Sequence, residues 1–140
     1  MHANPSQQTH AKRHAVRVLV VEDNVDAALT LADLLTLWGY DVRVVHDGLA
    51  ALEVAPVYRP EAVLLDIGLP KMDGYGVARW LRAQPPLAGV LIVGVTGYGQ
   101  ERDRQLSREA GFDHHLVKPV DLGLLRRLLE EAGQEPEPAS

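Results

Sequence analysis

The sequence VRVLVVEDN occupies residues 16–24 and decides how the rest of the chain is interpreted. Its first six residues are almost all apolar and mostly β-branched, which is typical of a strand buried on both faces. The apolar run ends abruptly at Glu22-Asp23-Asn24, so two carboxylates and an amide follow the strand directly. Strands of this kind belong to parallel sheets covered by helices, and polar residues at their carboxyl ends are candidates for a functional site.

Four further apolar segments follow, and helical patterns separate them. The expected strands cover residues 41–45, 62–65, 90–95 and 115–117. The expected helices are centred on residues 28–38, 49–55, 77–81, 100–110 and 125–132. Five strands that alternate with five helices predict an α/β fold with a doubly wound, five-stranded parallel sheet.

Length and composition fit one ordinary globular domain. The chain has 140 residues, of which 46% are hydrophobic and 24% are charged. Residues 1–14 are expected to form a flexible leader, residues 15–133 the folded domain and residues 134–140 a flexible tail. The absence of cysteine excludes disulfides and thiol chemistry.

The charge balance limits the possible partners. Fourteen Lys and Arg residues against 19 Asp and Glu residues give a formal charge of −5, which argues against nucleic-acid binding. No apolar run approaches the roughly 20 residues that span a bilayer, so no membrane association is expected. The leader also lacks the apolar segment of a secretory signal, and a cytoplasmic location is therefore expected.

Side chains that can bind ions or take part in catalysis follow four of the expected strands: Glu22 and Asp23, Asp66, Thr96, and Lys118. Because carboxyl ends of parallel strands share one edge of the sheet, we expect these residues to lie in one crevice. Two like charges about 4 Å apart repel by about 4 kcal/mol at an effective dielectric constant of 20. Lys118 and a hard divalent cation such as Mg²⁺ are expected to neutralise the carboxylates.

Asp66 is the candidate reactive group. A carboxylate is a competent nucleophile toward phosphorus, with which it forms an acyl phosphate. The phosphoryl oxygens would need a metal ion, an ammonium group and a hydroxyl donor, and the crevice offers all three. Two simpler interpretations remain open at this point: residues 22–24 as no more than a cap for the next helix, and Asp66 as a solvated turn residue.

Four segments resemble the motifs of the receiver domains of two-component response regulators, as found in chemotaxis regulators. They cover residues 18–24 (VLVVEDN), 64–74 (LLDIGLPKMDG), 95–97 (VTG) and 116–119 (LVKP), in the family's order and spacing. The resemblance extends over roughly residues 15–133. It implies a flavodoxin-like sheet with strand order 2-1-3-4-5.

The resemblance also implies a Mg²⁺-dependent phosphorelay function. Asp66 would accept a phosphoryl group from a phosphohistidine on a histidine kinase or a histidine phosphotransfer protein. Asp23 and Asp66 would bind the Mg²⁺ directly, Glu22 would assist through water, and the backbone carbonyl of Gly68 would be a further ligand. Lys118 would pair with the phosphoryl group.

Further roles follow from the same resemblance. Thr96 would donate a hydrogen bond to the phosphoryl group, Gly97 would leave room for it, and the peptide bond before Pro119 would be cis. His115 occupies the position where the family often has Tyr or Phe, a ring that swings inward when the threonine moves. His115 is therefore either a switch residue together with Thr96 or an ordinary strand histidine. Tyr98 is predicted to slow hydrolysis of the acyl phosphate.

These implications predict a signalling switch rather than a conventional enzyme, one that catalyses only its own phosphorylation and dephosphorylation. A haloacid dehalogenase-like phosphatase would need an aspartate at Gly68, and a flavin module would need a Ser/Thr/Gly loop in place of residues 22–24. The chain is either a stand-alone regulator or a receiver fragment of a hybrid histidine kinase. Its downstream protein target and a phosphorylation-dependent dimer remain open. The other histidines, including His46, are interpreted as surface residues.

Overall fold

The computed structural model describes residues 14–97 and 108–133. Its five strands form one parallel sheet in the order β2-β1-β3-β4-β5, which confirms the predicted topology. The strands are β1 (Arg17–Val21), β2 (Asp41–Val45), β3 (Ala62–Asp66), β4 (Leu91–Thr96) and β5 (His114–Val117). Their bounds differ from the predicted ones by one residue at most.

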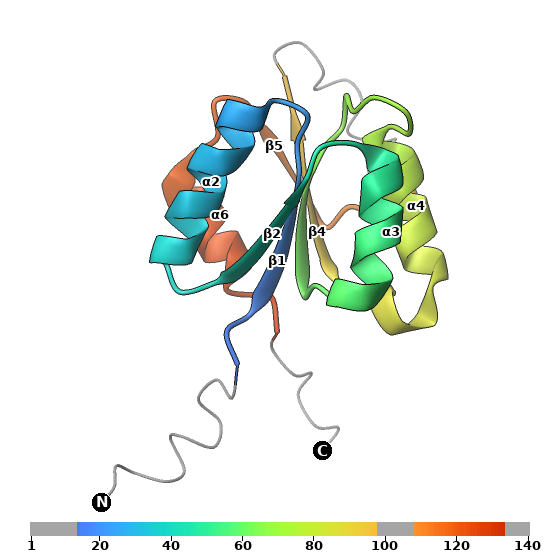
Figure 1. The fold of residues 1–140 in the computed structure, drawn as a ribbon, viewed down its shortest axis with the longest axis horizontal. Helices are drawn as coiled ribbons and strands as arrows, with labels where there is room; N and C mark the ends of the chain where they lie inside the picture. Colours follow the sequence, from blue (N-terminus) through green and yellow to red (C-terminus); the bar gives the residue numbers. More distant parts are fainter. Residues whose placement is uncertain (1–13, 98–107, 134–140) are drawn as a thin grey trace, which may run out of the picture.

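Helices cover both faces of the sheet. The helices with bounds in the described residues are α2 (Val25–Leu37), α3 (Gly48–Tyr58), α4 (Gly74–Ala83), α6 (Leu122–Leu129) and the 3₁₀ helix η1 (Pro85–Leu87). Helices α2 and α6 lie on one face, and α3 and α4 lie on the other (Figure 1). Residues 108–110 are helical, and the rest of the helix expected over 100–110 lies outside the described residues.

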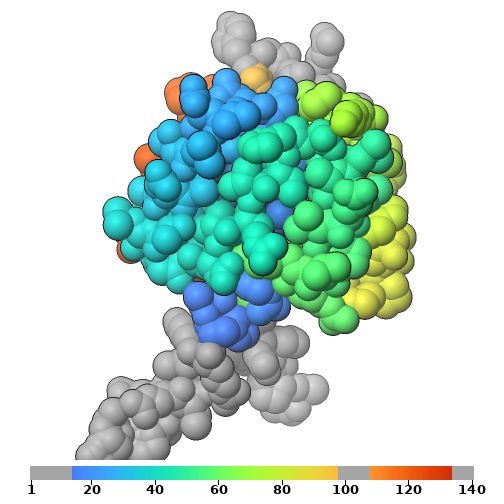
Figure 2. All heavy atoms as spheres, in the orientation of Figure 1, coloured from blue at the N-terminus to red at the C-terminus, as the bar shows by residue number. Residues whose placement is uncertain are grey.

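Two hydrophobic clusters hold these layers together. Alternate residues of β1 point to opposite faces, so Leu19 and Val21 pack with α3 and α4, whereas Val18 and Val20 pack with α2 and α6. All four side chains are at most 1% exposed, as expected for a central parallel strand. In the space-filling view, side-chain atoms occupy the gaps that the ribbon drawing leaves between its elements on the visible face (Figure 2). The sheet is therefore a rigid platform for the loops at its carboxyl edge.

Short polar residues fix where the helices begin. The side chains of four residues each accept a hydrogen bond from the backbone N–H three positions later, namely Asn24, Asp47, Asp73 and Asp121. The helix expected over 49–55 continues to Tyr58 with Pro56 inside it. The last helix ends at Leu129 instead of reaching Ala132, because the N–H groups of residues 130–132 bond three positions back and tighten the chain into a turn.

Arg82 of α4 connects three segments of the chain. Its guanidinium donates hydrogen bonds to the carbonyl oxygens of Ala88 (2.7 Å) and Val90 (2.6 Å), which precede β4. It also donates to the carbonyl oxygen of Gly111 (2.7 Å) and to the carboxylate of Asp113 (2.8 Å), which precede β5. The side chain is 25% exposed, so its fork of donors replaces most of its contact with water.

We expect Arg82→Ala to lower the free energy of unfolding by about 2–3 kcal/mol, because several acceptors lose a charged donor together. Arg82→Lys is expected to lose most of the same free energy, since one ammonium group cannot reach acceptors in two directions. Urea denaturation checks both variants. Arg79→Ala, at an exposed position of the same helix, serves as the control and should change stability by less than about 0.5 kcal/mol. Equal stability of Arg82→Ala and this control would contradict the expected role.

Two predictions about the whole chain stay predictions. No helix in residues 14–97 and 108–133 is both long and apolar enough to cross a membrane. The cytoplasmic location remains an expectation from the sequence. The same holds for the division into a leader, a folded domain from residue 15 to 133 and a tail.

Candidate functional site

The carboxyl edge of the sheet collects the predicted site residues. Val21 pairs with Leu65 in the β1–β3 register, so Glu22 and Asp66 each follow directly at neighbouring strand ends. Thr96 pairs with Val117 in the β4–β5 register, so Thr96 and Lys118 are brought to the same edge. All the strands point toward this edge, at the top of Figure 1.

Three carboxylates converge at this edge. Glu22, Asp23 and Asp66 each offer one carboxylate oxygen, and these oxygens lie within 4.8 Å of one another. Glu22 is buried, with 8% of its surface exposed, whereas Asp23 is exposed and Asp66 is half-buried. The predicted convergence of the three acidic residues is present in the structure.

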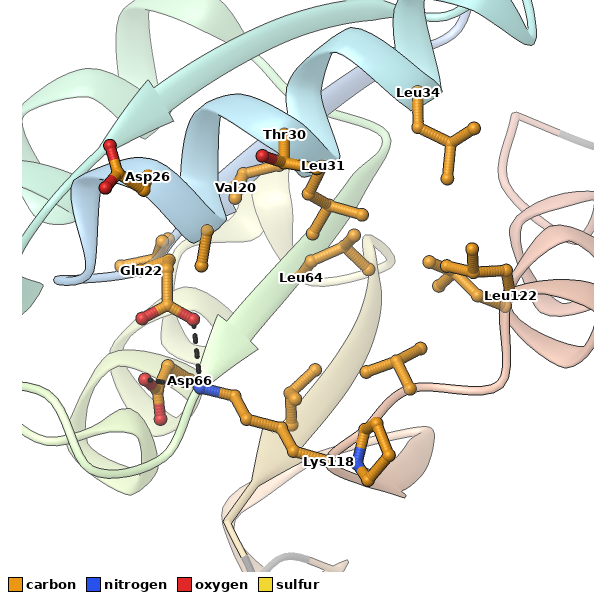
Figure 3. A pocket seen from close by; sticks show the side chains of 16 residues that line it. Val20, Glu22, Asp26, Thr30, Leu31, Leu34, Leu64, Asp66, Lys118 and Leu122 are labelled. Carbon is orange, nitrogen blue, oxygen red and sulfur yellow. Dashed lines mark hydrogen bonds and ion pairs between the residues drawn. The ribbon is translucent and has the colours of Figure 1, made fainter.

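Lys118 lies against two of these carboxylates (Figure 3). Its Nζ is 3.1 Å from Glu22 Oε1 and 3.6 Å from Asp66 Oδ2. Burial alone would lower the pKa of Lys118, but the hydrogen bond to Glu22 and the negative charges of Asp66 and Glu22 together raise it. Lys118 therefore remains a cation at neutral pH and offsets part of the carboxylate repulsion.

Main-chain donors orient the carboxylates. The N–H of Asn24 donates to Glu22 Oε2 at 3.0 Å, so both oxygens of Glu22 have partners when Lys118 is counted. The N–H of Gly68 donates to Asp66 Oδ1 at 3.0 Å. These bonds fix the directions in which the Glu22 and Asp66 carboxylates point.

The donor set fits a magnesium ion. Mg²⁺ prefers hard oxygen ligands about 2.1 Å away, so opposite ligands of one ion stand about 4.2 Å apart. The 4.8 Å limit on the three carboxylate oxygens is close to this separation. Three carboxylates and one ammonium carry a formal charge of −2, which a divalent cation balances. The residues present therefore suit a hard divalent cation.

Thr96 and His115 contact each other across the neighbouring strands β4 and β5. Thr96 is fully buried, and its Oγ1 shares a hydrogen bond of 3.0 Å with His115 Nε2. The register places His115 beside Gly94, two residues before Thr96 on the neighbouring strand. The structure thus brings the two predicted switch residues into direct contact, and their switching role stays a prediction.

The remaining predicted site residues have simpler surroundings. The Lys118-Pro119 peptide bond is cis, as the resemblance implies. A Cβ built at Gly97 meets no atom within 4 Å, so there is open space beside this residue. Tyr98 lies outside the described residues, and its predicted effect on hydrolysis stays a prediction.

A largely apolar pocket of about 460 Å³ opens beside the acidic residues. It lies between α2 and the segment that joins β5 to α6, and Leu31, Leu64 and Leu122 line it (Figure 3). Glu22, Asp66 and Lys118 line its other end, so the pocket leads to the candidate site. No single segment of the sequence indicates this pocket, because residues of β1, α2, β3, β4, α6 and the segment before α6 all line it.

Comparison with known proteins identifies the family. The family model for the response regulator receiver domain matches residues 18–130 of the chain. The chain belongs to this family. The polar-differentiation response regulator DivK of Brucella anthropi is 31% identical over 105 residues, which are 75% of this chain and 85% of DivK.

Solved receiver domains share the fold. The receiver domain of a sensor histidine kinase from Pseudomonas aeruginosa PAO1 is 34% identical and has a TM-score of 0.77, with 85% of this chain and 98% of that chain covered. The chemotaxis response regulator CheY4 of Vibrio cholerae is 27% identical, with a TM-score of 0.77 and coverage of 83% and 100%. The Pseudomonas structure has a magnesium ion coordinated in its active-site cleft.

The chain is thus a receiver domain of the response-regulator type, and the predicted family is confirmed. Receiver domains are signalling switches rather than conventional enzymes, and histidine kinases phosphorylate them. Membership of this family favours the switch function over the dehalogenase-like and flavin-binding alternatives.

One contact at the site could not be predicted from the sequence. His46, interpreted as a surface residue, is exposed, but its Nδ1–H donates a hydrogen bond of 2.9 Å to the backbone carbonyl of Glu22. The two residues are 24 positions apart, and no spacing rule connects them. Only the pairing of β2 with β1 brings them together.

Proposed function

We propose that Asp66 accepts a phosphoryl group from a phosphohistidine in a Mg²⁺-dependent reaction. The observation that carries this proposal is the convergence of Asp66 with Glu22, Asp23 and Lys118 at the carboxyl edge of the sheet. Asp66 is the one carboxylate of this group that is neither buried like Glu22 nor exposed like Asp23, and it is the last residue of β3. Its Oδ2 faces Lys118, and its Oδ1 accepts from Gly68.

The chemistry needs one carboxylate oxygen as the nucleophile. An oxygen of Asp66 attacks the phosphorus, a P–O bond forms, and the P–N bond of the phosphohistidine breaks. The imidazole nitrogen of the donor leaves with the electron pair and takes up a proton. Lys118 then pairs with a phosphoryl oxygen, which is favourable because its ammonium already lies 3.6 Å from Asp66.

Asp23, Asp66 and the backbone carbonyl of Gly68 hold the Mg²⁺ in this proposal, and Glu22 assists through a water molecule. The indirect role of Glu22 is supported by its contacts, since Lys118 and the N–H of Asn24 already occupy its two oxygens. When bound, Mg²⁺ supplies positive charge to the phosphoryl oxygens. Autophosphorylation and autodephosphorylation are the only reactions that the chain catalyses in this proposal.

Thr96 and His115 form the proposed switch. The Thr96 hydroxyl, now bonded to His115 Nε2, turns to donate to the phosphoryl group, and Gly97 leaves room beside it. His115 then loses this hydrogen-bond partner and rearranges. The rearrangement changes the surface near β5 and thereby controls binding of a downstream protein, either directly or through a phosphorylation-dependent dimer.

Transfer from a protein donor tests the proposal. A histidine kinase or histidine phosphotransfer protein carrying labelled phosphohistidine is mixed with the chain, with and without Mg²⁺. The label is expected to move to the chain only when Mg²⁺ is present. Failure of every such donor, together with failure of small phosphodonors, would overturn the proposal.

The apolar pocket beside Asp66 suggests where the donor protein docks. Leu122 lines this pocket and is 47% exposed, so Leu122→Asp would place a charge on the approach to Asp66. We expect phosphotransfer from the donor protein to become about tenfold slower, because an apolar contact at the docking surface is lost. Phosphorylation by a small phosphodonor is expected to stay unchanged.

Leu37→Asp is the matched control for Leu122→Asp. Leu37 is 82% exposed at the carboxyl end of α2, away from the pocket, and its replacement should leave both reactions unchanged. Equal transfer rates from the donor protein to Leu122→Asp and Leu37→Asp would contradict docking at the pocket.

A further inference from the structure

The segment between β2 and α3 holds the main chain of Glu22. This segment is His46 and Asp47, and it is considered together with Gly48, the first residue of α3. It follows Val45, whose carbonyl oxygen accepts a hydrogen bond of 3.0 Å from the N–H of Glu22. His46 Nδ1–H in turn donates to the carbonyl oxygen of Glu22 at 2.9 Å. The polar groups of the Glu22 backbone are therefore both bonded to the end of β2 and the residue after it.

The same segment also packs directly against the loop that follows Asp66. A Cβ on the buried Gly48 would lie 2.9 Å from Met72 Cβ and would overlap the Met72 carbonyl oxygen. Only glycine permits this close approach of two backbones. An ion pair of 3.6 Å between Asp47 and Lys71 accompanies it, but both side chains contact solvent, so the pair contributes little.

Met72 belongs to a loop that is closed at its base. The N–H of Gly74 donates to the carbonyl oxygen of Ile67 at 3.0 Å, and a Cβ at Gly74 would lie 2.7 Å from Ile67 Cα. Gly68 lies between this closed base and Met72, and its N–H donates to Asp66. The position of Gly68 therefore depends on the packing of Met72 on Gly48 as well as on the base.

We propose that His46 and Gly48 are positioning residues that set the separation of the two loops carrying the magnesium ligands. His46 fixes the Glu22–Asp23 side, and Gly48 fixes the side that contains Gly68. This inference rests on the proposed function, in which both loops bind one ion. Mg²⁺ demands nearly ideal octahedral geometry, and loss of residues that orient metal ligands typically lowers metal affinity by about 10- to 100-fold.

Replacement of His46 distinguishes loss of its hydrogen bond to Glu22 from loss of the imidazole ring. His46→Ala is expected to weaken Mg²⁺ binding about tenfold, measured by calorimetric titration of the full chain with Mg²⁺ alone. His46→Asn is expected to stay within about threefold of the parent, because the asparagine side-chain N–H₂ can donate from nearly the same place as Nδ1–H. Since His46 is exposed, neither variant disturbs the core, and thermal unfolding without Mg²⁺ should be similar in both.

Replacement of Gly48 tests the second contact. Gly48→Ala is expected to weaken Mg²⁺ binding at least tenfold, because the loop after Asp66 must move to admit the new methyl group. Gly89→Ala is the matched control, since a Cβ at Gly89 meets no atom within 4 Å and Gly89 lies far from the site in sequence. If Gly48→Ala does not fold, the comparison of His46→Ala with His46→Asn decides alone.

The outcomes distinguish this inference from the proposed function. No Mg²⁺ uptake by the parent chain would overturn the proposed function and the inference with it. Uptake by the parent with equal affinities in His46→Ala and His46→Asn, or in Gly48→Ala and Gly89→Ala, would overturn the positioning role and leave the proposed function standing. Selective loss in His46→Ala and Gly48→Ala would support both.

Discussion

Asp66→Asn is expected to take up no phosphoryl group from a small phosphodonor in the presence of Mg²⁺. An asparagine has nearly the same shape and can still accept the hydrogen bond that Gly68 donates to Asp66, but its amide is not a nucleophile toward phosphorus. The variant also loses the negative charge that faces Lys118 at 3.6 Å. Incorporation of labelled phosphate, measured after separation of the chain from the donor, checks this result.

Asp73→Asn is the matched control for this prediction. Asp73 lies in the same loop and caps α4 by accepting from the N–H of Gly76, a role that asparagine performs about as well. Its replacement should leave phosphate incorporation close to that of the parent. Continued labelling of Asp66→Asn would contradict the assignment of Asp66, and equal loss in both variants would indicate damage to the loop instead.

Removal of Mg²⁺ is expected to lower the phosphorylation rate by more than about 100-fold. The ion contributes several kcal/mol of charge stabilisation to phosphoryl transfer, and each 1.4 kcal/mol is a factor of ten in rate. Without it, the three carboxylates and the incoming phosphoryl oxygens repel one another, and the ammonium of Lys118 contacts two of these carboxylates. The measurement compares rates with Mg²⁺ and with a chelator, and restoration by added Mg²⁺ is the control.

Asp23→Asn tests the dependence of phosphorylation on Mg²⁺ by removing a single proposed ligand. We expect at least tenfold weaker Mg²⁺ binding and correspondingly slower phosphorylation at low Mg²⁺, because one of the three carboxylates is lost. Asp26→Asn is the matched control, since Asp26 is also exposed and borders the pocket but lies outside the group of three. Equal Mg²⁺ affinities in the two variants would contradict the proposed ligand set.

Much of the fold follows from local signals in the sequence. The apolar runs that became β1, β3 and β4 are buried on both faces, and such runs are short, continuous and bounded by polar residues. The carboxyl edge that parallel strands share also predicts that Asp66 and Lys118 lie together. That argument needs only the order of the strands, not the details of side-chain packing.

Contacts between distant segments were not predictable in the same way. The packing of Gly48 on Met72 and the bond from His46 to Glu22 join residues with no sequence relationship, so their partners emerge only from the folded chain. The hydrogen bonds of Arg82 to backbone carbonyls are of the same kind, since a carbonyl has no sequence signature. The early end of α6 at Leu129 reflects a change in backbone hydrogen bonding that the apolar pattern through Ala132 does not reveal.

The most direct measurement is to incubate the parent chain with Mg²⁺ and a small phosphodonor and to locate the modified residue by mass spectrometry. We expect one phosphoryl group per chain, attached to Asp66, and no modification when Mg²⁺ is chelated. Attachment to another residue, modification that persists without Mg²⁺, or steady turnover of phosphate esters without a stable acyl phosphate would contradict the account.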